Sequence, residues 1–340
     1  MKHQIAYTEI YITNVCNYSC THCQSLNNFA FKGHQRWKDY REEYRALSER
    51  IDITTIQIIG GEPTLNPDFE KWVDGISKLW PKSKLQIATN GSRLDKLNSN
   101  IYEILSRNNG TLWLTCHNLE LYNTMLDFAR EFLDEIVADY QPDSEATENW
   151  KISYDSIREE SWPNCDTIEE FVNLPEAIKT QIIKIHRLNP ELHLRTVPRM
   201  LIDKNGVEVK LDWAQTFVSS AIKVVDRQQM TMKYNSDPIE AHNNCYFKSC
   251  HQLNKGKLYK CPLVSVLPDF LDQFTVNISD ADRAIAKSYT PVSGSDSDSI
   301  ISNFVNNIDQ PIDQCKFCPT KHSRHNFVGT DKKIKIVSLQ

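Results

Sequence analysis

The stretch YTEIYITNVCNYSCTHC, residues 7 to 23, joins an expected strand to three closely spaced cysteines. Polar and apolar residues alternate in YTEIYIT, as in a strand with one buried face. Cys16, Cys20 and Cys23 follow with three and then two residues between them. A structural zinc site needs four ligands in a closed tetrahedron. Three cysteines in one loop can instead hold three irons of a [4Fe-4S] cube and leave the fourth iron open.

Three further strand and helix pairs are expected after this stretch. Strands are expected at residues 54–61, 84–91 and 111–118, each followed by a helix, at 66–80, 92–110 and 121–140. Asn66 is expected to cap the first of these helices and Pro67 to occupy its first position. Strand–helix units of this length predict a parallel sheet covered on both faces, curled into a partial (β/α)6-type TIM barrel. Chemistry in such barrels lies at the C-terminal ends of the strands, where the cysteines, GGEP and TNG occur.

The pattern changes near residue 235, where we place a domain boundary. Residues 1–235 are predicted to form the barrel, which includes a hairpin at 192–211 that turns at KNG. Residues 236–340 are predicted to form a small α+β domain with a second hairpin that turns at Lys255 and Gly256. The loop at 291–299 is expected to cap a helix at 300–308.

An acidic insertion is expected at about residues 131–180. Residues 131–170 contain thirteen acidic and two basic side chains, a net charge of -11, whereas the whole chain carries -5. A solvated acidic surface is the simplest interpretation, and contact with a basic partner or substrate is the alternative.

Composition favours a globular protein of the cytoplasm. No run of eighteen apolar residues is present, and the N-terminus lacks the profile of a signal peptide. In that compartment disulfides are rare, so the ten cysteines, eight of them in two groups, are interpreted as metal ligands. The basic residues are scattered without a basic and aromatic stripe, so a nucleic acid is not an expected partner. The lack of a long apolar run argues against a membrane as a partner.

Together, CNYSCTHC, GGEPTLNPDF and TNG at the ends of three successive strands resemble the radical S-adenosylmethionine (radical SAM) enzymes. The resemblance implies that Cys16, Cys20 and Cys23 hold a [4Fe-4S] cluster whose open iron binds S-adenosylmethionine (SAM). In that family, an electron from the cluster cleaves SAM and yields the 5'-deoxyadenosyl radical, which abstracts a hydrogen atom from the substrate. A flavodoxin or ferredoxin is then the expected electron donor. A zinc module is the alternative.

The same resemblance suggests the residues that bind SAM. Gly60 and Gly61 would let the backbone approach the methionyl group, and Glu62 would accept a hydrogen bond from its ammonium. His22 occupies the position where the family usually has an aromatic residue near the adenine.

Weaker candidates come from the strand ends. Asn90 and Thr115 are placed to contact the methionyl or ribose groups, or are ordinary polar residues of turns. Arg195 could meet a carboxylate, or form a structural ion pair. Cys116 and His117 could face the substrate, although a buried cysteine more often acts as a small apolar residue.

The second cysteine group resembles the auxiliary-cluster domain called twitch, a shortened relative of the SPASM domain. Its candidate ligands are Cys245, Cys250, Cys261, Cys315 and Cys318. Four of these would enclose a second [4Fe-4S] cluster. The spacing to Gly256 favours Cys245, whereas proximity across the hairpin favours Cys250. A zinc site remains the alternative, because C-x2-C pairs also occur there.

Three functions are compatible with these features. The first is an enzyme that oxidises or cross-links a peptide or a small molecule with help from the auxiliary cluster. The second is a redox-neutral rearrangement or epimerisation of a nucleotide, sugar or peptide. The third is a non-enzymatic iron–sulfur carrier, which GGEP argues against because a carrier does not need a turn that binds methionine.

Overall fold

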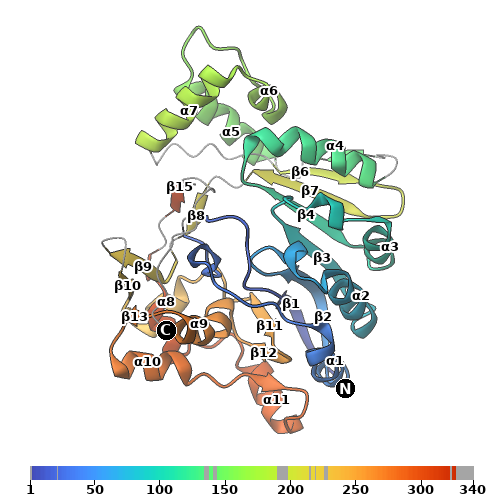
Figure 1. The fold of residues 1–340 in the computed structure, drawn as a ribbon, viewed down its shortest axis with the longest axis vertical. Helices are drawn as coiled ribbons and strands as arrows, with labels where there is room; N and C mark the ends of the chain where they lie inside the picture. Colours follow the sequence, from blue (N-terminus) through green and yellow to red (C-terminus); the bar gives the residue numbers. More distant parts are fainter. Residues whose placement is uncertain are drawn as a thin grey trace.

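One large mixed sheet organises the protein in the computed structural model (Figure 1). The structure describes residues 2–20, 22–133, 138–140, 144–189, 198–213, 216–218, 220–225, 229–321 and 324–326. Its sheet of ten strands has the order β14-β12-β11-β1-β2-β3-β4-β7-β6-β5. Six neighbouring strands in its centre are parallel: β11 (His251–Asn254), β1 (His3–Tyr11), β2 (Ile51–Ile59), β3 (Lys84–Thr89), β4 (Thr111–Cys116) and β7 (Glu208–Trp213).

Helices connect the first four parallel strands in the predicted alternation. They are α1 (Trp37–Ser48), α2 (Phe69–Leu79) and α3 (Ser99–Arg107), and α4 (Tyr122–Phe132) follows β4. Isoleucines of β2 such as Ile53, Ile56 and Ile58 are almost fully buried, since the sheet is covered on both faces. The predicted fold class, an α/β protein with a partial barrel, is confirmed.

The outer strands of the sheet are antiparallel. β6 (Arg199–Ile202) pairs antiparallel with β7 as the predicted hairpin, and β5 (Ala138–Tyr140) follows at the edge. At the other edge lie β12 (Lys257–Tyr259) and β14 (Val292–Ser293). The simple succession of parallel strands therefore stops after β4, because the chain next supplies a helical segment and a hairpin.

The predicted boundaries of three helices were wrong. The helix expected at 92–110 spans only Ser99–Arg107 (α3), after a 3-10 helix at Leu94–Lys96. The helix expected to begin at Pro67 begins at Phe69, after a short 3-10 helix at Pro63–Leu65. Asn66 still accepts a hydrogen bond from the Asp68 N–H at 2.8 Å, so it stabilises the turn before the helix. The helix expected at 121–140 ends at Phe132, and its last three residues form the edge strand β5.

The acidic insertion contains three helices with a hydrophobic core of their own. They are α5 (Ser144–Ile157), α6 (Ile168–Val172) and α7 (Glu176–Leu188), and they lie at the top of Figure 1. Trp150, Tyr154 and Phe171 are buried against one another in this core. The Thr167 and Glu170 side chains form a reciprocal capping box at the start of α6. The insertion is therefore a folded helical segment with its own core, and not simply a charged loop.

The C-terminal residues extend the same sheet and add a second layer of helices. The predicted hairpin is β11 and β12, and β11 pairs with β1. The helices are α8 (Pro238–Asn243), α9 (Pro262–Gln273), α10 (Asp280–Lys287), α11 (Asp298–Asn306) and the 3-10 helix η5 (Asp313–Phe317).

As expected, the loop before α11 caps it, through the Ser297 hydroxyl. Shorter strands complete this part: β8 (Thr216–Val218) with β15 (Arg324–Asn326), and β9 (Ile222–Val225), β10 (Gln229–Met232) and β13 (Val276–Asn277). The domain boundary near residue 235 stays a prediction.

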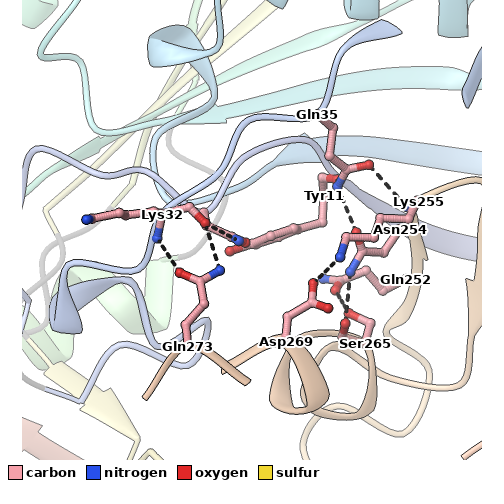
Figure 2. Close-up of polar contacts among 10 residues, drawn as sticks. Tyr11, Lys32, Gln35, Gln252, Asn254, Lys255, Ser265, Asp269 and Gln273 are labelled. Carbon is pink, nitrogen blue, oxygen red and sulfur yellow. Dashed lines mark hydrogen bonds and ion pairs between the residues drawn. The ribbon is translucent and has the colours of Figure 1, made fainter. Parts of the chain in front are cut away.

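Gln35 links the N-terminal loop to the C-terminal hairpin (Figure 2). Its side-chain amide donates to the Tyr11 carbonyl and to Asn254 Oδ1 at 2.7 Å, and its Oε1 accepts from the Lys255 N–H at 3.1 Å. Its backbone carbonyl accepts from Asn66 and from the Trp72 indole. Because Gln35 is 8% exposed, these bonds lie away from water and hold the hairpin against β1, the strand that precedes the first cysteines.

Among the described residues, no helix combines the length and the apolar character that crossing a membrane requires.

Candidate active site

The first three cysteines lie in the loop that leaves the C-terminal end of β1. Cys16 is 8% exposed, and Cys20 and Cys23 are partly exposed. Burial raises the pKa of the Cys20 thiol, and the nearby Cys23 and Cys16 raise it further. Three soft donors thus share a confined space, which fits the thiolate ligands of an iron–sulfur cluster.

Hydrogen-bond donors surround two of these sulfur atoms. The Tyr18 N–H points at Cys16 Sγ at 3.4 Å, and the Asn90 amide lies 3.9 Å from the same sulfur. Backbone N–H groups of residues 25 to 28 bond to Cys23 and lower its pKa, against the larger effect of burial. Donors of this kind stabilise a thiolate and adjust the potential of a bound cluster.

The glycine pair of GGEP brings the end of β2 against the cysteine loop. A Cβ atom on Gly61 would lie 2.5 Å from the Val15 carbonyl oxygen and 2.9 Å from Cys16 Cβ. A Cβ atom on Gly60 would lie 2.8 Å from Thr13. The Gly61 N–H donates to the Thr13 carbonyl at 2.8 Å, so the two segments are held in this close contact. In the structure, the two glycines make room for the cysteine loop.

The Glu62 carboxylate joins the GGEP turn to the TNG turn. Its Oε1 accepts from the Thr64 N–H at 3.1 Å, the Thr64 hydroxyl at 2.5 Å and the Thr89 hydroxyl at 2.6 Å. Its Oε2 accepts from the Asn90 N–H at 2.7 Å. Burial raises the pKa of Glu62, and these hydrogen bonds oppose the rise. With about four acceptor positions on a carboxylate, Glu62 is largely satisfied within the protein.

A cavity of about 270 Å³ opens beside these groups. It is lined by the three cysteines, by Gly60 to Glu62, and by Asn90 and Thr115 from the two next strands. Tyr18 and His117 also line it, and their rings meet edge to face at 5.8 Å. Burial lowers the pKa of His117 to about 4, so its ring is neutral at pH 7.

The weaker candidates are distributed differently. His22 has a left-handed backbone with φ of 68° and is not among the residues that line the cavity in the described part of the chain. Cys116 is fully buried, and burial raises its pKa to about 12. Arg195 lies outside the described residues.

The comparison with known families agrees with this geometry. Residues 10–121, which contain the cysteine loop and both turns, match the model of the radical SAM superfamily. Residues 10–121 form a radical SAM domain. A domain of this superfamily implies SAM and a [4Fe-4S] cluster as cofactors. The cavity offers thiols, hydrogen-bond donors and polar side chains such as Asn90 and Thr115, which fit these groups.

Curated relatives of the chain with this radical SAM domain include two proteins named GTP 3',8-cyclase. The protein from Nautilia profundicola is 30% identical over 92 residues, which are 26% of this chain and 29% of the relative. The protein from Haemophilus ducreyi is 33% identical over 97 residues, 28% of each chain. The match therefore spans less than a third of the curated relatives.

Two solved structures are similar over 34–38% of this chain. SuiB of Streptococcus suis bound to precursor peptide SuiA is 22% identical, with 38% of this chain and 30% of SuiB covered and a TM-score of 0.32. BtrN in complex with AdoMet and 2-DOIA is 20% identical, with 34% and 47% covered and a TM-score of 0.27.

Outside the radical SAM domain, four cysteines of the second group approach one another. Cys245 follows α8, Cys261 precedes α9, and Cys315 and Cys318 belong to η5 and its end. Burial raises the pKa of Cys318, and the Cys261, Cys245 and Cys315 thiols raise it further. Cys245 and Cys261 also line one cavity with Cys318.

The fifth candidate, Cys250, has a different partner. Its thiol forms a hydrogen bond with the Glu9 carboxyl on β1, and burial together with Glu9 raises its pKa. The Cys261 and Cys245 thiols also raise the pKa of Cys250, so Cys250 lies beside the four cysteines.

Among the described residues, no three His, Cys, Asp or Glu side chains converge closely enough to bind a single metal ion. A [4Fe-4S] cube has four irons that bind its four thiolates, so its cysteines need not meet at one point.

Several residues of the site were not predicted from the sequence. Thr64 and Thr89 bond to Glu62, and Tyr18 lines the cavity. Glu9 is half-buried on β1, where it looked like an ordinary polar residue of an alternating strand. The hydroxyl of Thr64, two residues after Glu62, was a signal that could have been found, because short polar side chains often bond across such turns.

Proposed function

We propose that this radical SAM enzyme reductively cleaves SAM and uses the 5'-deoxyadenosyl radical to oxidise or cross-link a small molecule or a peptide. The observation that carries the proposal is the cavity shared by the three cysteines, the GGEP turn and the TNG turn. When bound, the cluster supplies the electron that breaks a carbon–sulfur bond of SAM.

The protein's own residues would bind and orient the cofactors. Cys16, Cys20 and Cys23 would hold three irons, and the N–H groups near Cys23 and Cys16 would stabilise their thiolates. Because Glu62 already accepts from four donors, its role would be to fix the turn, while the Gly60 and Gly61 backbone receives the methionyl ammonium.

The remaining cavity residues would contact the other parts of SAM. Asn90 and Thr115 would do so from the ends of neighbouring strands, with the neutral His117 beside them. His22 does not line this cavity, so it would contact the adenine only if the adenine extended beyond the cavity.

We further propose that Cys245, Cys261, Cys315 and Cys318 bind an auxiliary [4Fe-4S] cluster and that Cys250 does not. The support is the mutual electrostatic proximity of the four thiols and the separate pairing of Cys250 with Glu9. The Val264 N–H bonds to Cys261 at the start of α9, which favours its thiolate. An auxiliary cluster would take up the electron that an oxidised substrate loses.

A second candidate is cyclisation or rearrangement of a nucleotide. It is favoured by the similarity of one segment to proteins named GTP 3',8-cyclase. That segment covers 26–28% of this chain, so the similarity leaves most of the chain, and with it the substrate, without a counterpart.

The proposed function can be tested in purified protein. Anaerobic reconstitution should give about eight irons per chain for two cubes, and incubation with dithionite and SAM should release 5'-deoxyadenosine. About four irons would reject the auxiliary cluster. No 5'-deoxyadenosine above the level of a Cys20→Ala variant would reject the function as a whole.

A further inference from the structure

The face of the sheet that borders the SAM cavity continues from β4 onto β7, which lie side by side (Figure 1). Ala88 and Thr115 line the cavity. Ala88 pairs with Trp113 across β3 and β4, and Thr115 pairs with Asp212 across β4 and β7. Paired residues of neighbouring strands point to the same face and lie about 4.8 Å apart. Trp113 and Asp212 therefore lie on the cavity's face, one strand away from its lining.

The burial of both strands agrees with this orientation. Four apolar side chains of β4 and β7 are fully buried in the main core: Leu112, Leu114, Val209 and Leu211. The residues that alternate with them point to the opposite face and are only partly buried. We call four of these residues the inner wall: Trp113, Thr115, Lys210 and Asp212. The inner wall is thus a polar surface that adjoins the SAM cavity.

Lys210 and Asp212 form an ion pair on the inner wall. Lys210 Nζ lies 3.2 Å from Asp212 Oδ2 and 4.0 Å from the centroid of the Trp113 ring. The two charged side chains are 25% and 20% exposed, so a ligand can reach both of them. Burial raises the pKa of Asp212, and Lys210 together with the Trp113 indole opposes the rise. The pair is therefore partly desolvated, which strengthens hydrogen bonds made to it.

The inner wall offers a donor and an acceptor whose charges cancel. An ammonium has three N–H donors and a carboxylate about four acceptor positions, so one ion pair leaves most of them for other partners. The paired neighbours of Lys210, Trp113 on β4 and Met200 on β6, are uncharged, as is Thr115 beside Asp212. The described part of the inner wall therefore has no net charge.

We infer that the inner wall binds a neutral group of the substrate that has a hydrogen-bond acceptor and a donor side by side, such as a carboxamide or a vicinal diol. The acceptor would face the Lys210 ammonium and the donor the Asp212 carboxylate. This inference rests on the proposed function, since it names the chemical class of the substrate. One member of the ion pair repels a charged group, whereas a neutral group can bond to both members. A substrate held there lies next to the cavity in which SAM would be cleaved.

The test uses reconstituted holoenzyme with SAM bound and no reductant, so that the probes cannot enter the SAM cavity. The four probes have three carbons each: propionamide, propane-1,2-diol, propionate and propylamine. Saturation-transfer NMR gives their dissociation constants at about pH 8, where Asp212 stays ionised although burial raises its pKa. We expect a neutral probe to bind at least about fivefold more tightly than both charged probes, because it gains a second hydrogen bond to a charged partner. Equal or tighter binding of either charged probe would overturn the inference.

Removal of either charge should change which probe binds best. Asp212→Asn leaves the Lys210 ammonium without its counter-charge, so propionate should gain at least about fivefold relative to propionamide. Lys210→Met leaves the carboxylate unpaired, so propylamine should gain instead. A ranking that neither variant alters would overturn the inference. Thermal melts check that the variants fold, and the ranking in the unaltered protein decides the inference if they do not.

Glu208→Gln is the matched control. Glu208 lies on the same face of β7 as Asp212, is 27% exposed and pairs with Lys84 at 2.6 Å. It lies four residues before Asp212, about 13 Å along the strand and away from the SAM cavity. The ranking of the probes should stay the same in this variant, and a change like that of Asp212→Asn would overturn the inference.

The two neutral probes identify the source of the bound group. Tighter binding of propionamide indicates an amide of a peptide, and tighter binding of the diol indicates a sugar-like polyol; both results support the inference. Release of 5'-deoxyadenosine is measured separately. A protein that cleaves SAM but does not prefer a neutral probe refutes this inference alone. A protein that does not cleave SAM refutes the proposed function, and the ranking of the probes still decides what the inner wall binds.

Discussion

Replacement of Gly61 by alanine tests how the GGEP turn supports the cysteine loop. The new Cβ would lie 2.5 Å from the Val15 carbonyl oxygen and 2.6 Å from its carbonyl carbon. Real Cβ contacts shorter than 3.0 Å essentially do not occur, so the two segments must separate by about 0.5 Å or more. The neighbours are backbone atoms, which cannot move aside by a change of rotamer.

The expected cost follows from two contributions. Overpacking of a tight contact costs about 1–3 kcal/mol. The separation also weakens the bonds from the Gly61 N–H to Thr13 and from the Glu62 N–H to Val15, at 2.8 and 2.9 Å, each of which contributes about 1 kcal/mol. We therefore expect the free energy of unfolding to fall by about 2–4 kcal/mol. Because Val15 precedes Cys16, the loop that holds the first cluster should also be displaced.

The assay combines urea denaturation with iron counting and SAM binding on the reconstituted variant. Gly206→Ala is the matched control, because Gly206 has φ of 77° and alanine there is strained, yet its Cβ would meet Asn109 at an ordinary 3.5 Å. Both variants should lose stability, but only Gly61→Ala should lose iron and SAM affinity. A Gly61→Ala protein with full iron content and unchanged SAM affinity would refute the reasoning.

Three further predictions test other parts of the account. Thr89→Val removes one donor to the buried Glu62, and urea denaturation should show a loss of about 1.5–3 kcal/mol; an unchanged midpoint would contradict the described hydrogen bonds. Gln35→Leu leaves buried partners unsatisfied at the hairpin, and we expect a loss of about 2–4 kcal/mol with faster proteolysis there. Cys245→Ala should lose about half of the reconstituted iron whereas Cys250→Ala keeps it; the reverse result would exchange their roles.

The local chemistry of the site could be predicted from the sequence because its residues are close along the chain. The three cysteines, the glycine pair and the strand ends follow one another in a regular alternation, which suffices to predict a parallel sheet with one functional edge. The contacts of the glycines could not be predicted, since the approach of Gly61 to Val15 depends on the register that pairs Tyr11 with Ile59.

The second cysteine group shows why other contacts could not be predicted from the sequence. Cys250 pairs with Glu9, a residue that lies 241 positions earlier in the chain and meets it only because β11 joins the sheet beside β1. The end of the helix after β4 was also missed. Residues 138–140 continue the helical pattern of polar and apolar residues, but pairing with β6 draws them into the sheet.

The central claim is that one iron beside Cys16, Cys20 and Cys23 is left open for SAM. It is tested most directly by electron paramagnetic resonance of the dithionite-reduced protein with and without SAM. We predict that SAM changes the spectrum of one cluster, and that this component is missing from Cys20→Ala. A spectrum that SAM does not alter would contradict the account.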